Sequence, residues 1–259
     1  MGFAVLHITK GSNGNGTGLE RHIDRTMNVP NANPELAHKN FYVRATPDLQ
    51  KCHSVTDRNK TPLRERINTR IKEGYTGKTA LRKDAVKYIS IVTSGSHDDM
   101  HQIVETNQLK TWAHQNFVFM AKQFGAKNIV EFSVHMDERT PHIHCVVVPL
   151  TTDGRLSAKE VMGNREKLSE LQSKYAEHMT SFKLNRGIKG SVATHETVKE
   201  YYARINDRMS PEFKNLQLAE QFDRLRKENA QLQGIIKDQD KKLNPEKYQD
   251  KTNRLSNEL

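Results

Sequence analysis

The chain of 259 residues has little of several features that define whole protein classes. It contains only two cysteines, Cys52 and Cys145, which excludes a disulfide-stapled scaffold and suits a reducing compartment. No apolar run approaches the roughly 18 residues that a membrane-spanning helix needs. The first residues also lack a charged leader followed by a long apolar stretch. We therefore expect a cytoplasmic protein without membrane insertion.

Positive charge, in contrast, is in excess. The chain has 41 Lys and Arg against 31 Asp and Glu, a net charge of +10, which favours polyanionic partners and nucleic acid above all. The excess lies ahead of residues 206–259, which hold 11 basic and 10 acidic residues. It is densest at 57–83, where nine basic residues accompany three acidic ones. We predict that this stretch binds DNA phosphates through Arg58, Lys60, Arg64, Arg66, Arg70, Lys72, Lys78, Arg82 and Lys83.

The same stretch also fits an ordinary amphipathic helix. Leu63, Ile67 and Ile71 recur at a spacing of four residues and would bury one side, which leaves the basic residues on a solvated face. The two interpretations are compatible, because a helix can bury one face and present the other to DNA.

Strands and helices alternate irregularly along residues 1–205, which indicates an α+β domain with an antiparallel sheet and flanking helices. A glycine-rich loop at 11–18 precedes a short helix that should carry His22 and Arg25. A turn containing Pro141 should join the last two strands into a hairpin. We predict strands at 3–9, 39–45, 85–94, 128–136 and 142–150, and long helices at 98–124 and 157–182.

Residues 206–259 have a different pattern and should form a helical extension. Between 218 and 243, apolar residues follow a heptad repeat that is typical of a coiled coil. Asn229 lies at a position of this repeat where a buried amide favours a coiled coil of two helices. A homodimer is one outcome, and packing of this helix back onto the domain is the other. One row of the heptad repeat consists of Leu218, Leu225 and Leu232, and the other of Phe222, Asn229, Ile236 and Leu243.

The strongest chemical signal is the stretch from His135 to His144. On a strand, His142 and His144 point to the same side, and pairing across the turn can bring His135 beside them. Three neutral imidazoles with open positions favour a catalytic site for Zn, Mn, Co or Ni. Asp137 and Glu138, in the turn, could orient a ligand or move a proton.

In a basic protein, such an ion would neutralise charge on a phosphodiester and orient it for in-line attack. The nucleophile must come from elsewhere in the fold. An activated water would make the protein a hydrolase, whereas a tyrosine or histidine would make it a covalent strand transferase.

These motifs resemble the HUH endonucleases and, more narrowly, the MobV relaxases, the Mob/Pre proteins of mobilisable plasmids. The resemblance covers most of residues 1–205 and includes the His-hydrophobic-His strand with its upstream histidine. The segments that carry it are Gly18 to Arg25, Asn33 to Asn40, Arg82 to Val86, His135 to His144, Leu156 to Lys159 and His195 to Val198.

The resemblance implies an enzyme that nicks one DNA strand at a transfer origin and stays linked to the 5′ end. Its DNA would be single-stranded or hairpin, its cofactor Mn²⁺, Mg²⁺ or another divalent ion, and its partner a type IV secretion coupling protein. His22 matches the nucleophilic histidine and Arg25 its polar companion. The matching metal ligands are His135, His142 and His144, with Glu138 as the neighbouring acid.

Two alternatives differ in the nucleophile or in the absence of one. A rolling-circle replication initiator would use tyrosine. Some relatives of the MobV family carry a tyrosine at the position of Phe41, and Tyr42 points away if Phe41 faces the site. A non-enzymatic metal-containing DNA-binding regulator would use no nucleophile at all.

Overall fold

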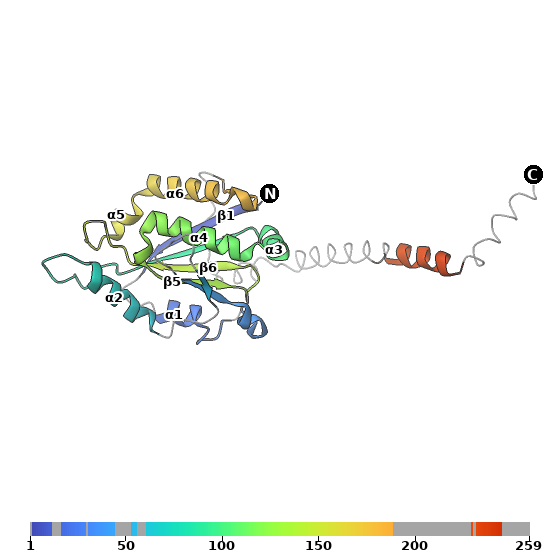
Figure 1. Cartoon of the computed structure of the whole chain (residues 1–259), viewed down its shortest axis with the longest axis horizontal. Coiled ribbons are helices and arrows are strands. Elements are labelled where there is room, and N and C mark those ends of the chain that lie inside the picture. The colour runs from blue at the N-terminus through green and yellow to red at the C-terminus, as the bar shows by residue number, and fades with distance from the viewer. Residues whose placement is uncertain are drawn as a thin grey trace, which may run out of the picture. The chain divides into compact units, whose positions relative to one another are not determined.

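The computed structural model describes residues 2–11, 17–29, 31–44, 53–55, 61–188, 229 and 232–244. The chain divides into two units, Met1–Ser191 and Val192–Leu259. In the first unit, helices lie on both faces of one sheet (Figure 1). Its strands are β1 (Gly2–Lys10), β2 (Phe41–Arg44), β3 (His53–Val55), β4 (Ile89–Gly95), β5 (Ile129–His135), β6 (His142–Val147) and β7 (Leu184–Arg186). Its helices are α1 (Thr17–Ile23), η1 (Pro34–Lys39), α2 (Leu63–Gly74), α3 (His97–Glu105), α4 (Leu109–Phe124), η3 (Ala126–Asn128), α5 (Ala158–Met162), α6 (Arg165–His178) and η4 (Thr180–Phe182).

The seven-stranded sheet has the order β3-β2-β5-β6-β4-β1-β7. All neighbours pair antiparallel except β1 and β7, which are parallel, so the sheet is mixed rather than wholly antiparallel as the sequence predicted. The parallel pair arises because η4 returns the chain to the start of β1, so that Leu184 lies opposite Gly2. The predicted α+β class and the β5–β6 hairpin are confirmed.

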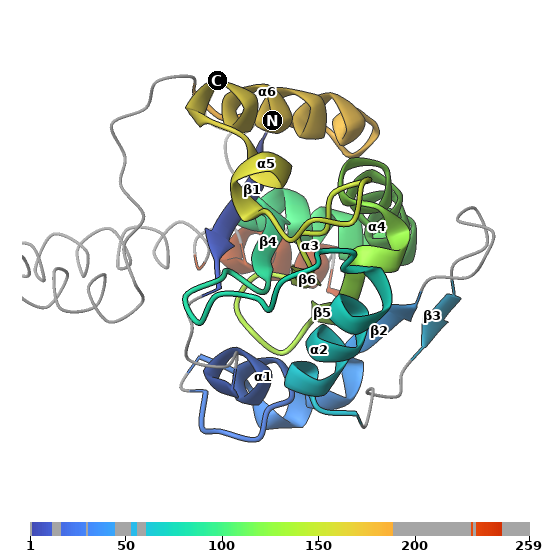
Figure 2. The same ribbon diagram turned by 90° about the vertical axis from the view of Figure 1, so that its left-hand side faces the viewer.

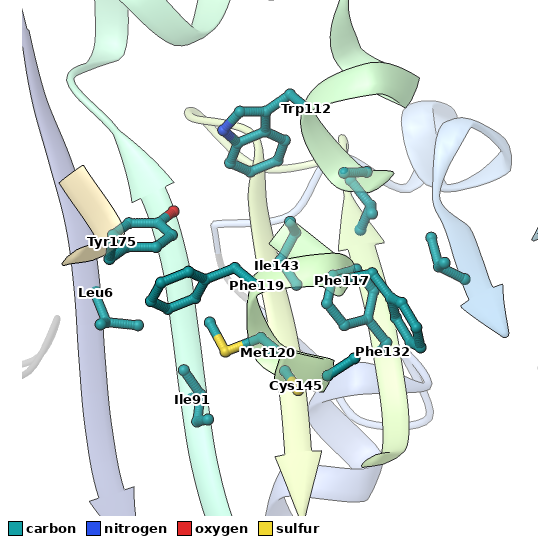
Figure 3. Packing of buried hydrophobic residues seen from close by; sticks show 14 of the residues in the cluster. Leu6, Ile91, Trp112, Phe117, Phe119, Met120, Phe132, Ile143, Cys145 and Tyr175 are labelled. Atoms are coloured by element: carbon teal, nitrogen blue, oxygen red, sulfur yellow. The ribbon is translucent and has the colours of Figure 1, made fainter. Parts of the chain in front are cut away.

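One face of the sheet carries the larger core. Trp112, Phe117 and Phe119 of α4 pack against strand residues such as Ile143, and Tyr175 joins them from α6 (Figure 3). Because strand side chains alternate, Ile143, Cys145 and Val147 of β6 enter this core, and their neighbours His142, His144 and Val146 face the other way. The histidines therefore lie on the face covered by α1 and α2.

On that second face, α2 buries the apolar side that its sequence predicted. Leu63, Ile67 and Ile71 pack with Ile23 of α1 and Val146 of β6. Figure 2 shows α1 and α2 side by side beneath the sheet. The end of α1 is thus fixed over β6.

Both long predicted helices are broken. The helix at 98–124 divides into α3 and α4, because Asn107 adopts a left-handed φ of 56°. The helix at 157–182 divides at Gly163, whose φ is 76°, and restarts where the Asn164 side chain accepts a hydrogen bond from Lys167 N. In both places a turn residue outweighs the apolar spacing.

In the second unit, residues 232–243 are helical and expose Leu232, Ile235, Ile236 and Leu243. Leu218, Phe222 and Leu225 of the heptads lie outside the described residues, as does the predicted domain boundary at 205/206. The coiled coil and the boundary remain predictions. Within the described residues, no helix combines the length and the hydrophobicity that crossing a membrane requires.

Candidate metal centre

Four histidines from three elements converge on the α1 side of the sheet. His135 of β5 and His142 of β6 are direct partners in the hairpin, and His144 follows on the same face. The end of α1 brings His22 to within 5.0 Å of His144, measured between ring centroids. Ligand nitrogens of all four residues lie within 4.8 Å of one another. The predicted grouping of His135, His142 and His144 is thus present, and His22 adjoins it.

The spacing of the imidazole nitrogens fits a shared ion. Nε2 of His142 and Nε2 of His144 are 3.2 Å apart. With metal–nitrogen bonds of about 2.1 Å, two ligands of one ion would be separated by about 3.0 Å at a right angle and about 3.4 Å at a tetrahedral angle. The outer nitrogen of His142 contacts the carbonyl oxygen of Thr140 at 2.9 Å, which is the usual way of orienting a ligand ring.

The local electrostatics keep three of these rings, those of His22, His135 and His144, in the form that binds metal. Burial, reinforced by the positive charge that a protonated His142 would carry, lowers the pKa of His135 to about 2. The same causes hold the pKa of His144 well below its usual value, and its Nδ1 atom is buried without a partner among the described residues. Burial also lowers the pKa of His22, against the opposing effect of Glu138. Neutral imidazoles are the form that coordinates divalent ions.

Arg25 connects the acidic turn to the histidines. The sequence placed it on the helix, but it follows α1 in a left-handed conformation with a φ of 55°. Its Nε and Nη2 atoms donate to the two carboxylate oxygens of Asp137 at 2.8 and 2.6 Å. Nη2 also donates to Glu138 at 2.7 Å and contacts Nδ1 of His135 at 3.1 Å, and Nη1 donates to the carbonyl oxygen of His22. The left-handed backbone conformation of Arg25 costs on the order of 1 kcal/mol or more, and the hydrogen bonds of its guanidinium offset this cost.

The two neighbouring acids have different surroundings. Asp137 is buried and accepts bonds from Arg25 and from the side-chain amide of Asn40. Burial alone would raise the pKa of Asp137, but these hydrogen bonds outweigh it and lower the pKa. Glu138 faces the rings instead, with Oε1 at 3.7 Å from Nε2 of both His22 and His142. Asp137 is thus placed to hold the turn and Glu138 to act on the histidines.

The sequence named Asn40 only as the end of a segment shared with the family and gave it no role in the site, yet it binds both the Asp137 carboxylate and the backbone N–H of Met136. A single polar residue ahead of an apolar strand carries no distinguishing pattern. Phe41 and Tyr42, which follow Asn40, face the opposite way from the arrangement considered in the sequence, in which Phe41 would face the site. Phe41 is buried in the core on the α4 side, so Tyr42 lies on the face of the histidines.

The predicted DNA-binding residues occupy different surroundings. Arg64, Lys72, Lys78, Arg82 and Lys83 are exposed. Arg66 and Arg70 have largely buried side chains that turn toward the sheet, where Arg66 pairs with Glu131 at 2.6 Å and Arg70 donates to Asn128 at 3.0 Å. Arg58 and Lys60 lie outside the described residues.

Comparison with known proteins gives consistent matches. A plasmid recombination enzyme type 3 from Mammaliicoccus lentus is 33% identical over 208 residues, which are 78% of this chain and 48% of that protein. A type 1 enzyme from Staphylococcus aureus is 30% identical over 241 residues, 91% of this chain and 56% of that protein. The chain thus spans about half the length of the curated relatives that it matches.

Solved structures agree with these sequence matches. The MobM relaxase domain bound to plasmid pMV158 oriT DNA of 22 nucleotides, in a Mn-bound crystal structure, is 30% identical with a TM-score of 0.68. That match covers 78% of this chain and 99% of the MobM chain. The family model for Mob_Pre, plasmid recombination enzyme, matches residues 1–203. This chain therefore belongs to the Mob_Pre family of plasmid recombination enzymes.

Proposed function

We propose that this chain is a relaxase that nicks one strand of DNA at a transfer origin and becomes linked to the 5′ end through His22. One observation carries the proposal: His22, on a separate helix, adjoins a group of three histidines suited to one ion. The Mn and oriT DNA in the solved relative have the chemistry that this group would require.

His135, His142 and His144 would hold the divalent ion, and the lowered pKa values of His135 and His144 fit that role. When bound, Mn²⁺ or Mg²⁺ would neutralise charge on the non-bridging oxygens of the scissile phosphate. The side chain of His22 is 31% exposed, so DNA can reach it, whereas that of His135 is fully buried. This difference supports His22 as the nucleophile rather than as a further ligand.

The reaction then uses this chain's own groups. The neutral imidazole of His22 attacks phosphorus, a P–N bond forms and the P–O3′ bond breaks. The 3′ oxygen leaves and takes up a proton from water. Glu138, whose Oε1 lies 3.7 Å from Nε2 of His22, is placed to accept the proton that the non-attacking imidazole nitrogen releases. The resulting phosphoramidate keeps the 5′ phosphate activated for resealing.

A tyrosine mechanism has one observation in its favour, because Tyr42 lies on the same face of the sheet as the histidines. However, Tyr42 pairs with Ser133, which in turn pairs with His144. At about 4.8 Å per strand, its Cα lies about 10 Å from that of His144. The closer His22 ring is the better candidate.

The test uses a supercoiled plasmid into which the DNA flanking the chain's own coding sequence has been cloned, with Mn²⁺ or Mg²⁺ supplied. The full chain should give protein-linked nicked DNA on a denaturing gel, and the link should be labile to acid, as a phosphoramidate is. His22→Ala should form no link and still bind Mn²⁺ by titration calorimetry. Tyr42→Phe should form the link, as should the control His38→Ala, which changes an exposed histidine outside the cluster.

Each contrary result points to a different protein. A link that survives acid and is lost in Tyr42→Phe would identify a tyrosine enzyme such as a replication initiator. Plasmid that binds the chain but stays supercoiled with either metal would identify a DNA-binding regulator.

The proposed partners follow from the helical region and from the family. Exposed Leu232, Ile236 and Leu243 on one helix support a homodimer through the predicted coiled coil. Sedimentation of the full chain should give a dimer, and Ile236→Lys should shift it to a monomer. A type IV secretion coupling protein would receive the DNA-linked chain. A pull-down of that protein from the host by this chain would test the second partner.

A further inference from the structure

One face of β1 is covered, whereas the other begins with two exposed apolar residues, Phe3 and Val5, and continues with His7 and Thr9. Leu6 lies in the core, and Ala4 and Ile8 pack against it. Helix α6 lies beside β1 (Figure 2). On the opposite face, Phe3 is 47% exposed and Val5 is 42% exposed. Strands with apolar residues on both faces are typically buried on both. The start of this outer face, at Phe3 and Val5, therefore has the composition of a contact surface.

This surface is continuous with the histidine group through the strand register. Val5 pairs with Ser94 of β4, and Thr93 pairs with Ile143, so Ser94 lies next to His142. The Ser94 hydroxyl also donates to the carbonyl oxygen of Pro141 at 2.7 Å. With strands about 4.8 Å apart, Val5 lies about 10 Å from His142, and Phe3 lies about 7 Å further along β1.

The chemistry of this surface suits nucleobases. Phe3 offers an aromatic ring, Val5 an aliphatic side chain, and exposed Asn185, which pairs with Phe3 across β1 and β7, an amide. None of the three is charged, so phosphates would be held elsewhere on this basic chain. Base-on-aromatic stacking is the usual way in which single strands are held without reading their sequence.

We propose that Phe3 and Val5 form a stacking surface for bases of the single strand next to the cleavage point. The inference rests on the proposed function, because it assumes that the scissile phosphate lies at the histidines. A strand rising about 3.4 Å per nucleotide, or more when unstacked, would reach the surface roughly two to three nucleotides from that phosphate. Phe3 then fixes the path of the strand and acts as a positioning residue.

The binding test compares bases with backbone. The full chain, with EDTA present, is titrated against a labelled oligonucleotide of 20 thymidines and against an abasic strand of the same length. Phe3→Leu and Val5→Ser should weaken binding of the thymidine strand about 5- to 100-fold and leave the abasic strand unchanged. Phe3→Trp should bind as the parent or more tightly. Thr9→Ala, at an exposed position on the same face of β1, is the matched control.

The proposal would be overturned if Phe3→Leu bound the thymidine strand as tightly as the parent does. It would also be overturned if Phe3→Leu lost as much affinity for the abasic strand as for the thymidine strand. Melting temperatures establish that each variant is folded, which is expected for exposed positions.

A cross-linking test identifies the occupant directly. A photoreactive benzoylphenylalanine at position 3 of the full chain should link to the thymidine strand on irradiation. Links only to the chain's own residues 192–259, or to a second copy, would show that protein covers this face and would refute the DNA surface. The proposed function fails separately: DNA stacking at Phe3 without any His22 adduct would refute the relaxase, whereas an adduct with no Phe3 effect would refute only the stacking surface.

Discussion

The buried pair of Arg66 and Glu131 gives a prediction that separates protein stability from DNA contact. Arg66 Nη1 lies 2.6 Å from the Glu131 carboxylate, and it also donates to the carbonyl oxygen of Val130. Their side chains are only 11% and 3% exposed. Arg66→Met would leave the carboxylate buried without its partner, which should lower the free energy of unfolding by about 3–5 kcal/mol at pH 8.

The pH dependence of this loss has a defined sign. Burial raises the pKa of Glu131, although Arg66 opposes the rise, so removing Arg66 should raise it further. A folded carboxyl with a raised pKa keeps its proton where the unfolded chain has released it. The stability of Arg66→Met should therefore fall as the pH rises from the ordinary value of 4.5 through the raised folded pKa. Its deficit should be smaller at about pH 5.5 than at pH 8.

Urea unfolding at both pH values measures these differences. The double variant Arg66→Met with Glu131→Gln should be more stable than Arg66→Met alone, because it removes the uncompensated charge. Arg64→Met, which changes an exposed residue of the same helix, is the control. If Arg66→Met unfolds at the parent's midpoint and instead loses affinity for DNA, the stability argument is wrong and Arg66 is a phosphate contact.

Three further predictions concern the acidic turn and the histidines. Arg25→Lys should slow single-turnover nicking roughly 100-fold, because one ammonium group cannot bridge Asp137 and Glu138 as the planar guanidinium does. The parent should lose stability as the pH falls below the ordinary Asp value of 3.8 and through the lowered folded pKa of Asp137. Asp137→Asn should be less stable by about 3 kcal/mol at pH 7. Melting scans of this variant should lack the acid loss that Asp137 causes. His144→Ala should weaken Mn²⁺ binding by more than about 100-fold in calorimetry, since even residues that only orient a ligand contribute 10- to 100-fold.

Each of these has a result that would contradict it. Parent-like nicking by Arg25→Lys would show that charge alone suffices at this position. An unchanged acid transition in Asp137→Asn would assign the transition to other carboxyls. Unaltered Mn²⁺ affinity in His144→Ala, with His38→Ala as the reference, would place the ion elsewhere.

Sequence patterns predicted the parts of the fold that depend on alternation. The spacing of His142 and His144 places both on one face of a strand, and the short turn makes His135 their neighbour. The spacing of Leu63 and Ile67 likewise predicted which side of α2 is buried. These features are local, so a short window of sequence is enough to specify them.

The remaining parts of the site depend on contacts between distant segments. The family resemblance singled out Glu138, but residue pattern alone does not separate its role from that of Asp137, because both roles follow from Arg25 and Asn40, about 100 residues earlier. Arg25 itself appeared helical, since apolar spacing does not reveal a left-handed residue. The side of the sheet on which Phe41 and Tyr42 lie depends on how β2 pairs with β5. The neighbouring residues in the sequence do not determine that pairing.

The turn between His135 and His142 is fixed at both ends and should not tolerate a change of length. It is anchored at one end by Asn40, through Met136 N, and at the other by Ser94, through the carbonyl oxygen of Pro141. A one-residue slip of the hairpin would rotate the histidine rings of β6 into the hydrophobic core beneath α4 and bring Ile143 out in their place. Loops between strands usually tolerate insertions, but scanning mutagenesis that adds single residues here should find almost none accepted.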